Sequence, residues 1–324
     1  NSFGEAYTGY GPLFPFVSFV YNTSSQITSN LVAAYGNIYV GTVSGVFAFN
    51  ATYGSTVWHR SSTPVQSLLV YDNLLIFANS TNISAVSPLS GSSLWSLKFS
   101  GISTQIVGYD NKIFFGGNDE VYAYYINGTA SWSLNVKGEP ESIAIIDGDV
   151  MAAESNGNLT IIGQQGKNAI ILLDKPVGVS SQIASKGIVA YFGGGSYANA
   201  SYINGSVVSG FPISISGQAV YNVVPYRSGV FYQLTTGLFY ASYSGRQIWS
   251  FSIPSLVSPV SGASSLIATN GFVYSLWQNG LLITNISNSQ FAFVEIPYSP
   301  IRDMIIAYGR LYIAAGDMVI AYGS

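Results

Sequence analysis

Acidic side chains are the residues of this sequence that could most readily do chemistry. The 324-residue chain has fourteen of them, and the candidates are five of those that lie between residues 119 and 154: Asp119, Glu120, Glu139, Glu141 and Glu154. Two carboxylates held close together can act as general acid and general base in a hydrolase, and a group of them can bind a cation or a cationic ligand. Loop acids are also common because charged side chains prefer solvent. The stretch is therefore a candidate ligand site, and both interpretations stay open.

The sequence offers few residues for other kinds of catalysis or for metal binding. The sequence holds one histidine, His59, and no cysteine, so sites built from three histidines or four cysteines cannot form. Gly193-Gly194-Gly195 lacks the helix and lysine that follow a phosphate-binding loop. The eleven basic residues are scattered and the net charge is −3, which argues against nucleic-acid binding. We predict no catalytic triad, no metal, no cofactor and no nucleic-acid partner.

The elements that would position these residues are visible as an internal repeat. Phe49 to Trp58 recurs as Val86 to Trp95 and as Ala123 to Trp132; each copy is an apolar strand, a glycine turn and a tryptophan four residues after the glycine. Trp249 follows Gly245 in the same way. The turn glycines recur every 37 to 40 residues, at Gly54, Gly91, Gly128, Gly166, Gly205 and Gly245. A regular period of this length is typical of β-propellers.

Each repeat contains four predicted strands, A to D. Upstream of the glycine turn, Leu31 to Gly41 resembles Ile143 to Ala152 and Ile305 to Ala315: a short apolar strand, a tight turn and an alternating strand. The last repeat ends after strand C, whereas an apolar segment at about 13–19 precedes the first strand A. If that segment supplies the missing strand D, the two ends of the chain close the ring.

The sequence therefore predicts an all-β fold: an eight-bladed β-propeller of four-stranded antiparallel blades, whose last blade is completed by the N-terminal strand. We expect one domain over residues 1–324, with a closing segment at 1–26, blades 1–7 at 27–301 and blade 8 at 302–324. In such a ring the D–A and B–C connections share one face. That face should collect the five acids from blades 3 and 4, with Arg302 and Asp303 across the channel on blade 8, while His59 lies on an outer strand D.

The repeat resembles the PQQ-like repeat, in a strand ending Tyr39-Val40-Gly41, the segment Gly45 to Asn50, and then Gly54 and Trp58. The resemblance covers nearly the whole chain. It implies the eight-bladed propeller of quinoprotein dehydrogenases and of scaffold proteins such as the outer-membrane assembly lipoprotein. The dehydrogenases hold their cofactor with calcium-binding acids, a catalytic aspartate and commonly a vicinal disulfide, whereas this chain has no cysteine and no matching acid cluster. We therefore interpret it as the non-catalytic scaffold type.

Composition and sequons indicate the environment. Only 8% of the residues are charged, and nine Asn-x-Ser/Thr sequons occur, at Asn22, Asn50, Asn79, Asn82, Asn127, Asn158, Asn199, Asn204 and Asn285. The chain starts at Asn1 rather than Met, which is consistent with a removed signal peptide, and no apolar run is long enough for a membrane span. A chain with few charges and no thiols loses little at low pH. We expect a secreted glycoprotein at the surface of an acidophilic archaeal cell.

These features favour an extracellular, N-glycosylated scaffold or protein-interaction module: a component of a surface layer, a filament or an adhesion structure. Its partners would be other cell-surface proteins or copies of itself, with N-linked glycans attached. Two alternatives remain. One is an acid-stable extracellular hydrolase that uses carboxylates of the channel face, and the other is a carbohydrate-binding propeller that uses its many tyrosines and tryptophans. The enzyme question stays open, with the balance against catalysis.

Overall fold

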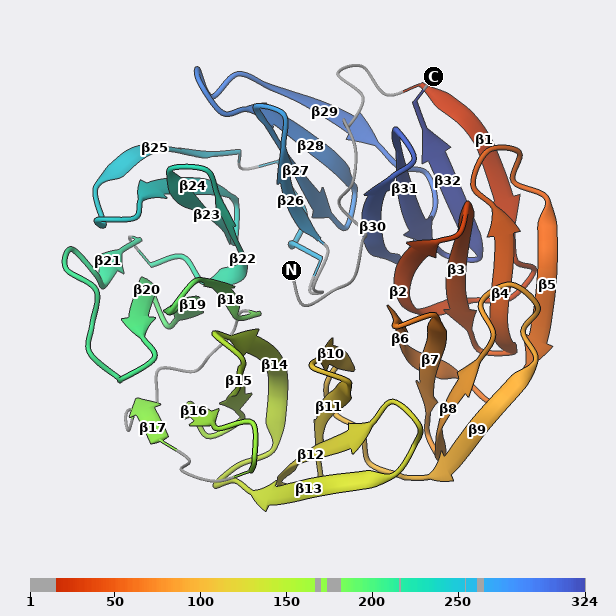
Figure 1. The fold of residues 1–324 in the computed structure, drawn as a ribbon. Coiled ribbons are helices and arrows are strands. Elements are labelled where there is room, and N and C mark those ends of the chain that lie inside the picture. The colour runs from red at the N-terminus through yellow and green to blue at the C-terminus, as the bar shows by residue number, and fades with distance from the viewer. Residues whose placement is uncertain are drawn as a thin grey trace.

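The computed structural model describes residues 16–166, 170–173, 182–215, 217–253, 255–260 and 265–323, the side chains of 170–173 excepted. Within these ranges the chain is all β and forms eight four-stranded antiparallel sheets. Figure 1 shows the sheets as the blades of a ring, with strand A of each blade toward the centre and strand D at the rim. The predicted eight-bladed β-propeller is confirmed. No helix in these ranges is long and apolar enough to cross a membrane.

Seven blades follow the chain in the strand order A to D. Blades 1 and 2 consist of β2 (Ile27–Ala34), β3 (Asn37–Thr42), β4 (Gly45–Asn50) and β5 (Thr56–Ser61), then β6 (Val65–Tyr71), β7 (Leu74–Asn79), β8 (Asn82–Val86) and β9 (Ser93–Lys98). Blades 3 and 4 consist of β10 (Val107–Tyr109), β11 (Lys112–Gly117), β12 (Glu120–Tyr125) and β13 (Ala130–Asn135), then β14 (Pro140–Ile146), β15 (Asp149–Glu154), β16 (Leu159–Ile162) and β17 (Ile170–Leu173). Blades 5 and 6 consist of β18 (Ala184–Lys186), β19 (Val189–Gly194), β20 (Tyr197–Tyr202) and β21 (Ile213–Ser214), then β22 (Val220–Tyr226), β23 (Gly229–Leu234), β24 (Gly237–Ser242) and β25 (Gln247–Ser252). Blade 7 consists of β26 (Leu266–Thr269), β27 (Phe272–Trp277), β28 (Gly280–Asn285) and β29 (Phe291–Glu295), and blade 8 of β30 (Ile301–Ala307), β31 (Arg310–Ala315), β32 (Met318–Tyr322) and the N-terminal β1 (Val17–Asn22).

The two ends of the chain close the ring, as predicted, because β1 pairs antiparallel with β32 as strand D of blade 8. The strand runs later than the expected segment at 13–19, of which residues 13–15 lie outside the described ranges. Tyr21 of β1 stacks on Phe49 of blade 1, with ring centroids 4.3 Å apart. The closing strand therefore completes blade 8 and also packs against blade 1.

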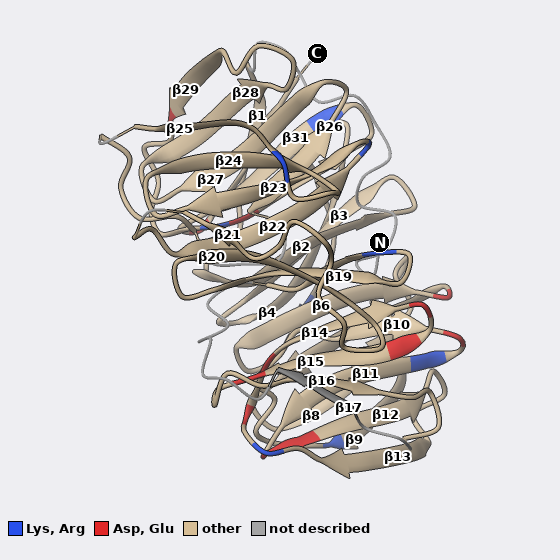
Figure 2. Cartoon of the chain, turned by 90° about the vertical axis from the view of Figure 1, so that its left-hand side faces the viewer, with Lys and Arg blue, Asp and Glu red and all other residues tan. Residues whose placement is uncertain are grey.

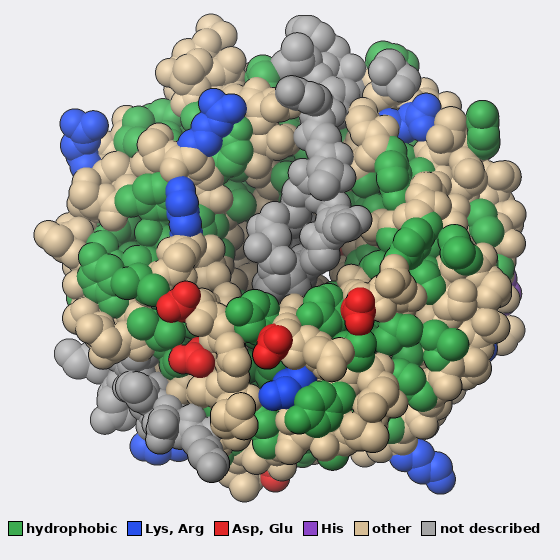
Figure 3. All heavy atoms as spheres, viewed as in Figure 1, with side chains coloured by type: hydrophobic (Ala, Val, Ile, Leu, Met, Phe, Trp, Pro, Cys, Tyr) green, Lys and Arg blue, Asp and Glu red, His purple; other side chains and the backbone are tan. Residues whose placement is uncertain are grey.

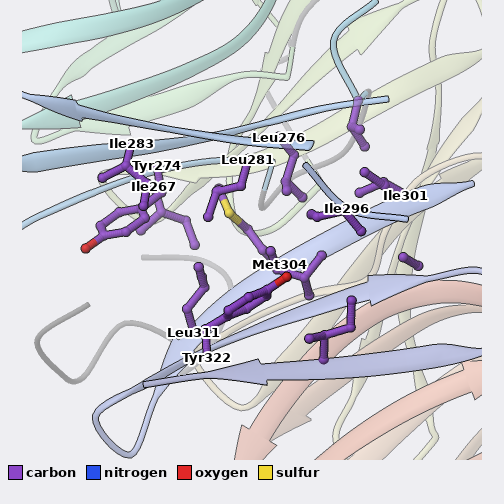
Figure 4. Close-up of a cluster of buried hydrophobic side chains, with 14 of the residues drawn as sticks. Ile267, Tyr274, Leu276, Leu281, Ile283, Ile296, Ile301, Met304, Leu311 and Tyr322 are labelled. Atoms are coloured by element: carbon purple, nitrogen blue, oxygen red, sulfur yellow. The ribbon is translucent and has the colours of Figure 1, made fainter. Parts of the chain in front are cut away.

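The hydrophobic core is divided among the blade interfaces. Among the described residues there are eight clusters of buried apolar side chains, and each cluster spans two neighbouring blades. The middle strands carry much of it, because both faces of each sheet are covered: every residue of β3 and of β23 is buried. Figure 4 shows the cluster between blades 7 and 8, where Leu276 and Leu281 lie near Met304 and Leu311. Burial of apolar surface is thus spread around the ring rather than gathered at one centre.

The repeat tryptophans and glycines meet across these interfaces. Three of the tryptophans lie on the D strands of blades 1 to 3: Trp58, Trp95 and Trp132. Each indole N–H donates to a backbone carbonyl of the next blade, at 2.9, 2.7 and 2.8 Å. Each ring also covers the next turn glycine; at Gly91 (φ +69°) an added Cβ would lie 2.8 Å from Trp58. Phe19 on β1 covers Gly54 in the same way. Glycine is needed there for its positive φ and for its lack of a side chain.

Candidate functional site

The structure places the five predicted acids on one face, at the D–A and B–C connections of blades 3 and 4. Asp119 and Glu120 lie at the B–C turn of blade 3, and Glu139 and Glu141 lie where the chain enters β14. Glu154 is the last residue of β15. Figure 2 shows the acidic residues of these blades, coloured red on the ribbon, toward both ends of the strands.

Glu139 holds the B–C turn of blade 3 in place. Its carboxylate oxygens accept the backbone N–H groups of Asn118, at 3.2 Å, and Asp119, at 2.8 Å. These two turn residues have φ values of +55° and +58°. In return, the backbone N–H of Val136 in the D–A connection donates to the carbonyl oxygen of Asp119, at 2.9 Å. The carboxylate thus satisfies backbone donors that would otherwise need water.

Glu154 anchors the same D–A connection from inside the protein. Its side chain is 1% exposed. One carboxylate oxygen accepts the Thr160 hydroxyl, and the other accepts the backbone N–H of Lys137, at 3.1 Å, and the Asn156 side-chain amide, at 3.4 Å. A buried carboxylate is costly unless such donors surround it. The contacts therefore give Glu154 a structural role.

The other three acids are more open. Asp119 and Glu141 are exposed, and the side chain of Glu141 makes no hydrogen bond within the described part of the chain. Burial raises the pKa of Tyr122, and the neighbouring Glu120 carboxylate raises it further. Two of the five acids, Glu139 and Glu154, therefore accept backbone N–H groups. This arrangement stabilises turns and does not leave a free pair of carboxylates.

Arg302 and Asp303 lie side by side in β30 but have opposite environments. Arg302 is exposed, whereas Asp303 is 2% exposed. The Asp303 Oδ2 atom accepts the backbone N–H of Leu31 in blade 1, at 2.7 Å. Asp303 therefore ties strand A of blade 8 to strand A of blade 1.

The same link recurs between other blades, and sequence reasoning missed it. Asn30 Oδ1 accepts the N–H of Leu68 at 2.9 Å, and Ser67 Oγ accepts the N–H of Ile106 at 3.0 Å. Each acceptor lies at or next to an irregularity in the pairing of strand A. A β-bulge leaves backbone groups without a ladder partner, and the neighbouring blade supplies one. The sequence feature that could have revealed this link is a polar residue just before the apolar part of each strand A.

The single histidine packs against an aromatic side chain. His59 lies on β5 at the rim, and its ring stacks on Phe47 with centroids 4.1 Å apart. Across the residues that the structure describes, no three histidine, aspartate or glutamate side chains come together in a way that could hold a metal ion.

The opposite face, formed by the A–B and C–D turns, carries a second set of charges that sequence reasoning did not single out. The A–B turns of blades 2 to 4 bear Asp72, Asp110, Asp147 and Asp149, and those of blades 5 and 6 bear Lys186 and Arg227. Figure 3 shows the acidic side chains gathered over blades 2 to 4 and basic ones over blades 5 and 6. Burial raises the pKa of Asp149, and the nearby Asp147 carboxylate raises it further.

We expect Glu139→Gln to lower the free energy of unfolding by about 1–2 kcal/mol. Both oxygens of Glu139 accept fixed backbone N–H groups, so a glutamine NH₂ group would have to face one of these donors. Urea unfolding followed by circular dichroism measures the loss. Glu141→Gln is the matched control and should change stability by less than about 0.5 kcal/mol. Equal stability of the two variants would contradict the role given to Glu139.

Comparison with known proteins agrees with this architecture. No known protein family and no curated protein matches the chain. A computationally designed protein, Ika8, superposes with a TM-score of 0.76 at 15% identity, covering 93% of this chain and 96% of that one. Sqt1 from Saccharomyces cerevisiae superposes with a TM-score of 0.73 at 11% identity, covering 98% of each chain.

BamB from Moraxella catarrhalis is a more distant structural match. It aligns with a TM-score of 0.49 at 17% identity, over 94% of this chain and 85% of its own. At identities this low, the superpositions with Ika8 and Sqt1 show a shared fold and nothing more. The eight blades are established by the strand pairing itself, and no family match assigns the chain to the PQQ-like repeat family.

Proposed function

We propose that this propeller is an extracellular, N-glycosylated scaffold at a cell surface, built from PQQ-like repeats. The observation that carries the proposal is the geometry of four sequons, those of Asn50, Asn127, Asn204 and Asn285. All four lie at or beside C–D turns, toward the rim of the face that the A–B turns also form. Glycans at these turns would shield that rim and leave the D–A/B–C face open to a partner protein or a second copy of the chain.

In each of these turns the asparagine side chain closes an Asx turn. The Oδ1 atom accepts the backbone N–H two residues later, at 2.9 to 3.0 Å. In three of them Oδ1 also accepts the hydroxyl of the sequon Ser or Thr, at 2.7 Å. The side-chain amide nitrogens make no hydrogen bond to any described residue. A side chain fixed through its oxygen in this way leaves the nitrogen available for a glycan.

The four turns are also regularly spaced around the ring. They belong to blades 1, 3, 5 and 7, so glycosylated and unmodified C–D turns would alternate. The C–D turns of blades 2, 4 and 6, which contain Gly91, Gly166 and Gly245, carry no sequon. A glycan at every second blade would cover the rim with even spacing.

The other five sequons differ in accessibility. Asn22 is exposed, and its Oδ1 atom accepts the N–H of Ser24 at 2.6 Å. Asn79 and Asn158 are only 6% and 7% exposed, and Asn79 Nδ2 donates to Ser62 Oγ at 3.0 Å. The amide nitrogens of two more donate to nearby oxygens within the fold: Asn82 and Asn199. A glycan on any of four asparagines would displace native contacts: Asn79, Asn82, Asn158 and Asn199.

Peptide mapping by mass spectrometry tests the proposal on protein taken from its native source. We expect glycans at Asn50, Asn127, Asn204 and Asn285, and none at Asn79 or Asn158. In the glycosylating host, Asn127→Gln should remove one glycan increment from the gel mobility, whereas the control Asn79→Gln should leave the mobility unchanged. Unmodified asparagines at all of the C–D turns would overturn the proposal.

A further inference from the structure

Four consecutive blades carry a tyrosine at or beside the A–B turn. We define the tyrosine crescent as Tyr308 of blade 8, Tyr35 of blade 1, Tyr71 of blade 2 and Tyr109 of blade 3. Two of them begin the turn, and the other two are the last residues of β6 and β10. Strand A is the innermost strand of each blade (Figure 1), so the crescent borders the centre of the A–B/C–D face.

Hydrogen bonds to the next blade hold three of these four rings in place. The Tyr308 hydroxyl accepts the backbone N–H of Gly36, at 2.9 Å, and the Tyr71 hydroxyl accepts that of Asn111, at 3.2 Å. The Tyr35 hydroxyl donates to a side-chain oxygen in the A–B turn of blade 2. Four neighbouring blades, 8, 1, 2 and 3, are thus linked through phenol groups. A ring held in this way loses little conformational entropy when a ligand covers it.

Much of the tyrosine surface nevertheless remains open. Tyr308, Tyr35 and Tyr109 are 44%, 47% and 40% exposed. Exposed carboxylates stand beside the rings, since Asp72 and Asp110 occupy the A–B turns of blades 2 and 3. The crescent therefore presents fixed aromatic surface together with hydrogen-bond acceptors.

We propose that the tyrosine crescent binds a neutral saccharide. One face of a sugar ring is lined by C–H groups and packs on an aromatic ring, while the sugar hydroxyls donate to carboxylates. The aspartates disfavour an anionic sugar, because like charges repel. The saccharide can be free, or it can be a glycan carried by a neighbouring molecule, since both present the same chemistry. This inference goes beyond the scaffold function and does not require that the chain itself be glycosylated.

Isothermal titration calorimetry on unglycosylated recombinant protein tests the site directly. The probes are neutral hexasaccharides of mannose, of glucose and of N-acetylglucosamine. We expect saturable binding of at least one probe. Tyr109→Ala should weaken it roughly three- to tenfold, and Tyr35→Ala with Tyr109→Ala should weaken it further. Tyr53→Ala is the matched control, because Tyr53 is 79% exposed in the C–D turn of blade 1, and it should bind like the wild type.

Several outcomes would overturn the inference. The first is that no probe binds at millimolar concentration. The second is that the wild type and the Tyr35/Tyr109 double variant bind equally when both have wild-type circular dichroism. The third is that a lysine-rich peptide displaces the bound probe, which would indicate a cation site.

Ultracentrifugation of native protein distinguishes the two sources of the saccharide. Self-association lost on enzymatic deglycosylation supports a neighbouring glycan, and a monomer that binds the free probe supports a free saccharide. Absence of glycans in the mass-spectrometric map would remove the scaffold proposal without affecting this one.

Discussion

Replacing Tyr21 with alanine should loosen the closure of the ring and lower the free energy of unfolding by about 3 kcal/mol. Tyr21 is 8% exposed, stacks on Phe49 and shares a 3.1 Å hydrogen bond between its hydroxyl and Thr56 Oγ1. Among the described strands β1 pairs only with β32, so the contacts of Tyr21 with blade 1 are a large part of what holds the closing strand. Chemical denaturation measures the loss. Hydrogen exchange followed by mass spectrometry should show faster exchange in β1 and β32 than in the blades opposite.

Val20→Ala is the matched control for this substitution. Val20 is the neighbouring residue of β1, it pairs with Ile320, and it is 43% exposed. Its loss should change stability by less than about 0.5 kcal/mol. A Tyr21→Ala variant that is as stable as Val20→Ala, or whose amides exchange faster by the same factor in every blade, would contradict the role given to β1.

The ring could be predicted from the sequence because each blade repeats the same physical requirement. A tryptophan on strand D must cover a turn that has no side chain, so Trp58 and Gly91 recur together at a fixed spacing. The closing strand was placed too early because the segment from Leu13 to Tyr21 is apolar at every position except Ser18. Such a run has no alternation that would fix the ends of a strand, and the pairing with β32 also contains a bulge between Val17 and Phe19.

The face that collects the acids could be predicted from topology, but the partners of the acids could not. Glu139 accepts two backbone N–H groups of a turn about twenty residues earlier in the chain, and that contact depends on the positive φ values of the turn. The links between strands A were missed for a different reason. Their acceptor is Asp303 in one blade, Asn30 in the next and Ser67 in the one after. A search by residue type cannot find a position that is defined only by its polarity and its place beside a bulge.

The buried ionisable groups predict that acid and alkali affect the stability of the protein differently. Burial raises the pKa of four tyrosines to about 12: Tyr39, Tyr191, Tyr243 and Tyr274. Burial also raises the pKa of Tyr232 well above its ordinary value. In the unfolded chain each phenol ionises near pH 10. The stability contributed by the neutral phenols is therefore complete below about pH 10 and is lost as the pH rises from about 10 to 12.

Asp149 is the carboxyl whose pKa is clearly shifted, and acid increases the stability that it contributes. The pKa of Asp149 is raised in the folded protein, so the folded state binds its proton more readily than the unfolded chain. Stability from this group increases as the pH falls through its folded pKa toward the unfolded value of 3.8. Asp149 therefore opposes acid unfolding, whereas the buried tyrosines promote alkaline unfolding.

We expect cooperative unfolding between pH 10 and 12, with absorbance of ionised tyrosine at about 295 nm rising in the same step as the circular dichroism is lost. Tyr191→Phe should move the midpoint to higher pH, because Tyr191 is 3% exposed and its hydroxyl makes no hydrogen bond within the described residues. Tyr53→Phe is the matched control, since Tyr53 is 79% exposed and its substitution should leave the midpoint unchanged. Gradual ionisation of all tyrosines in a protein that stays folded to pH 12 would show that the buried phenols do not control its alkaline limit.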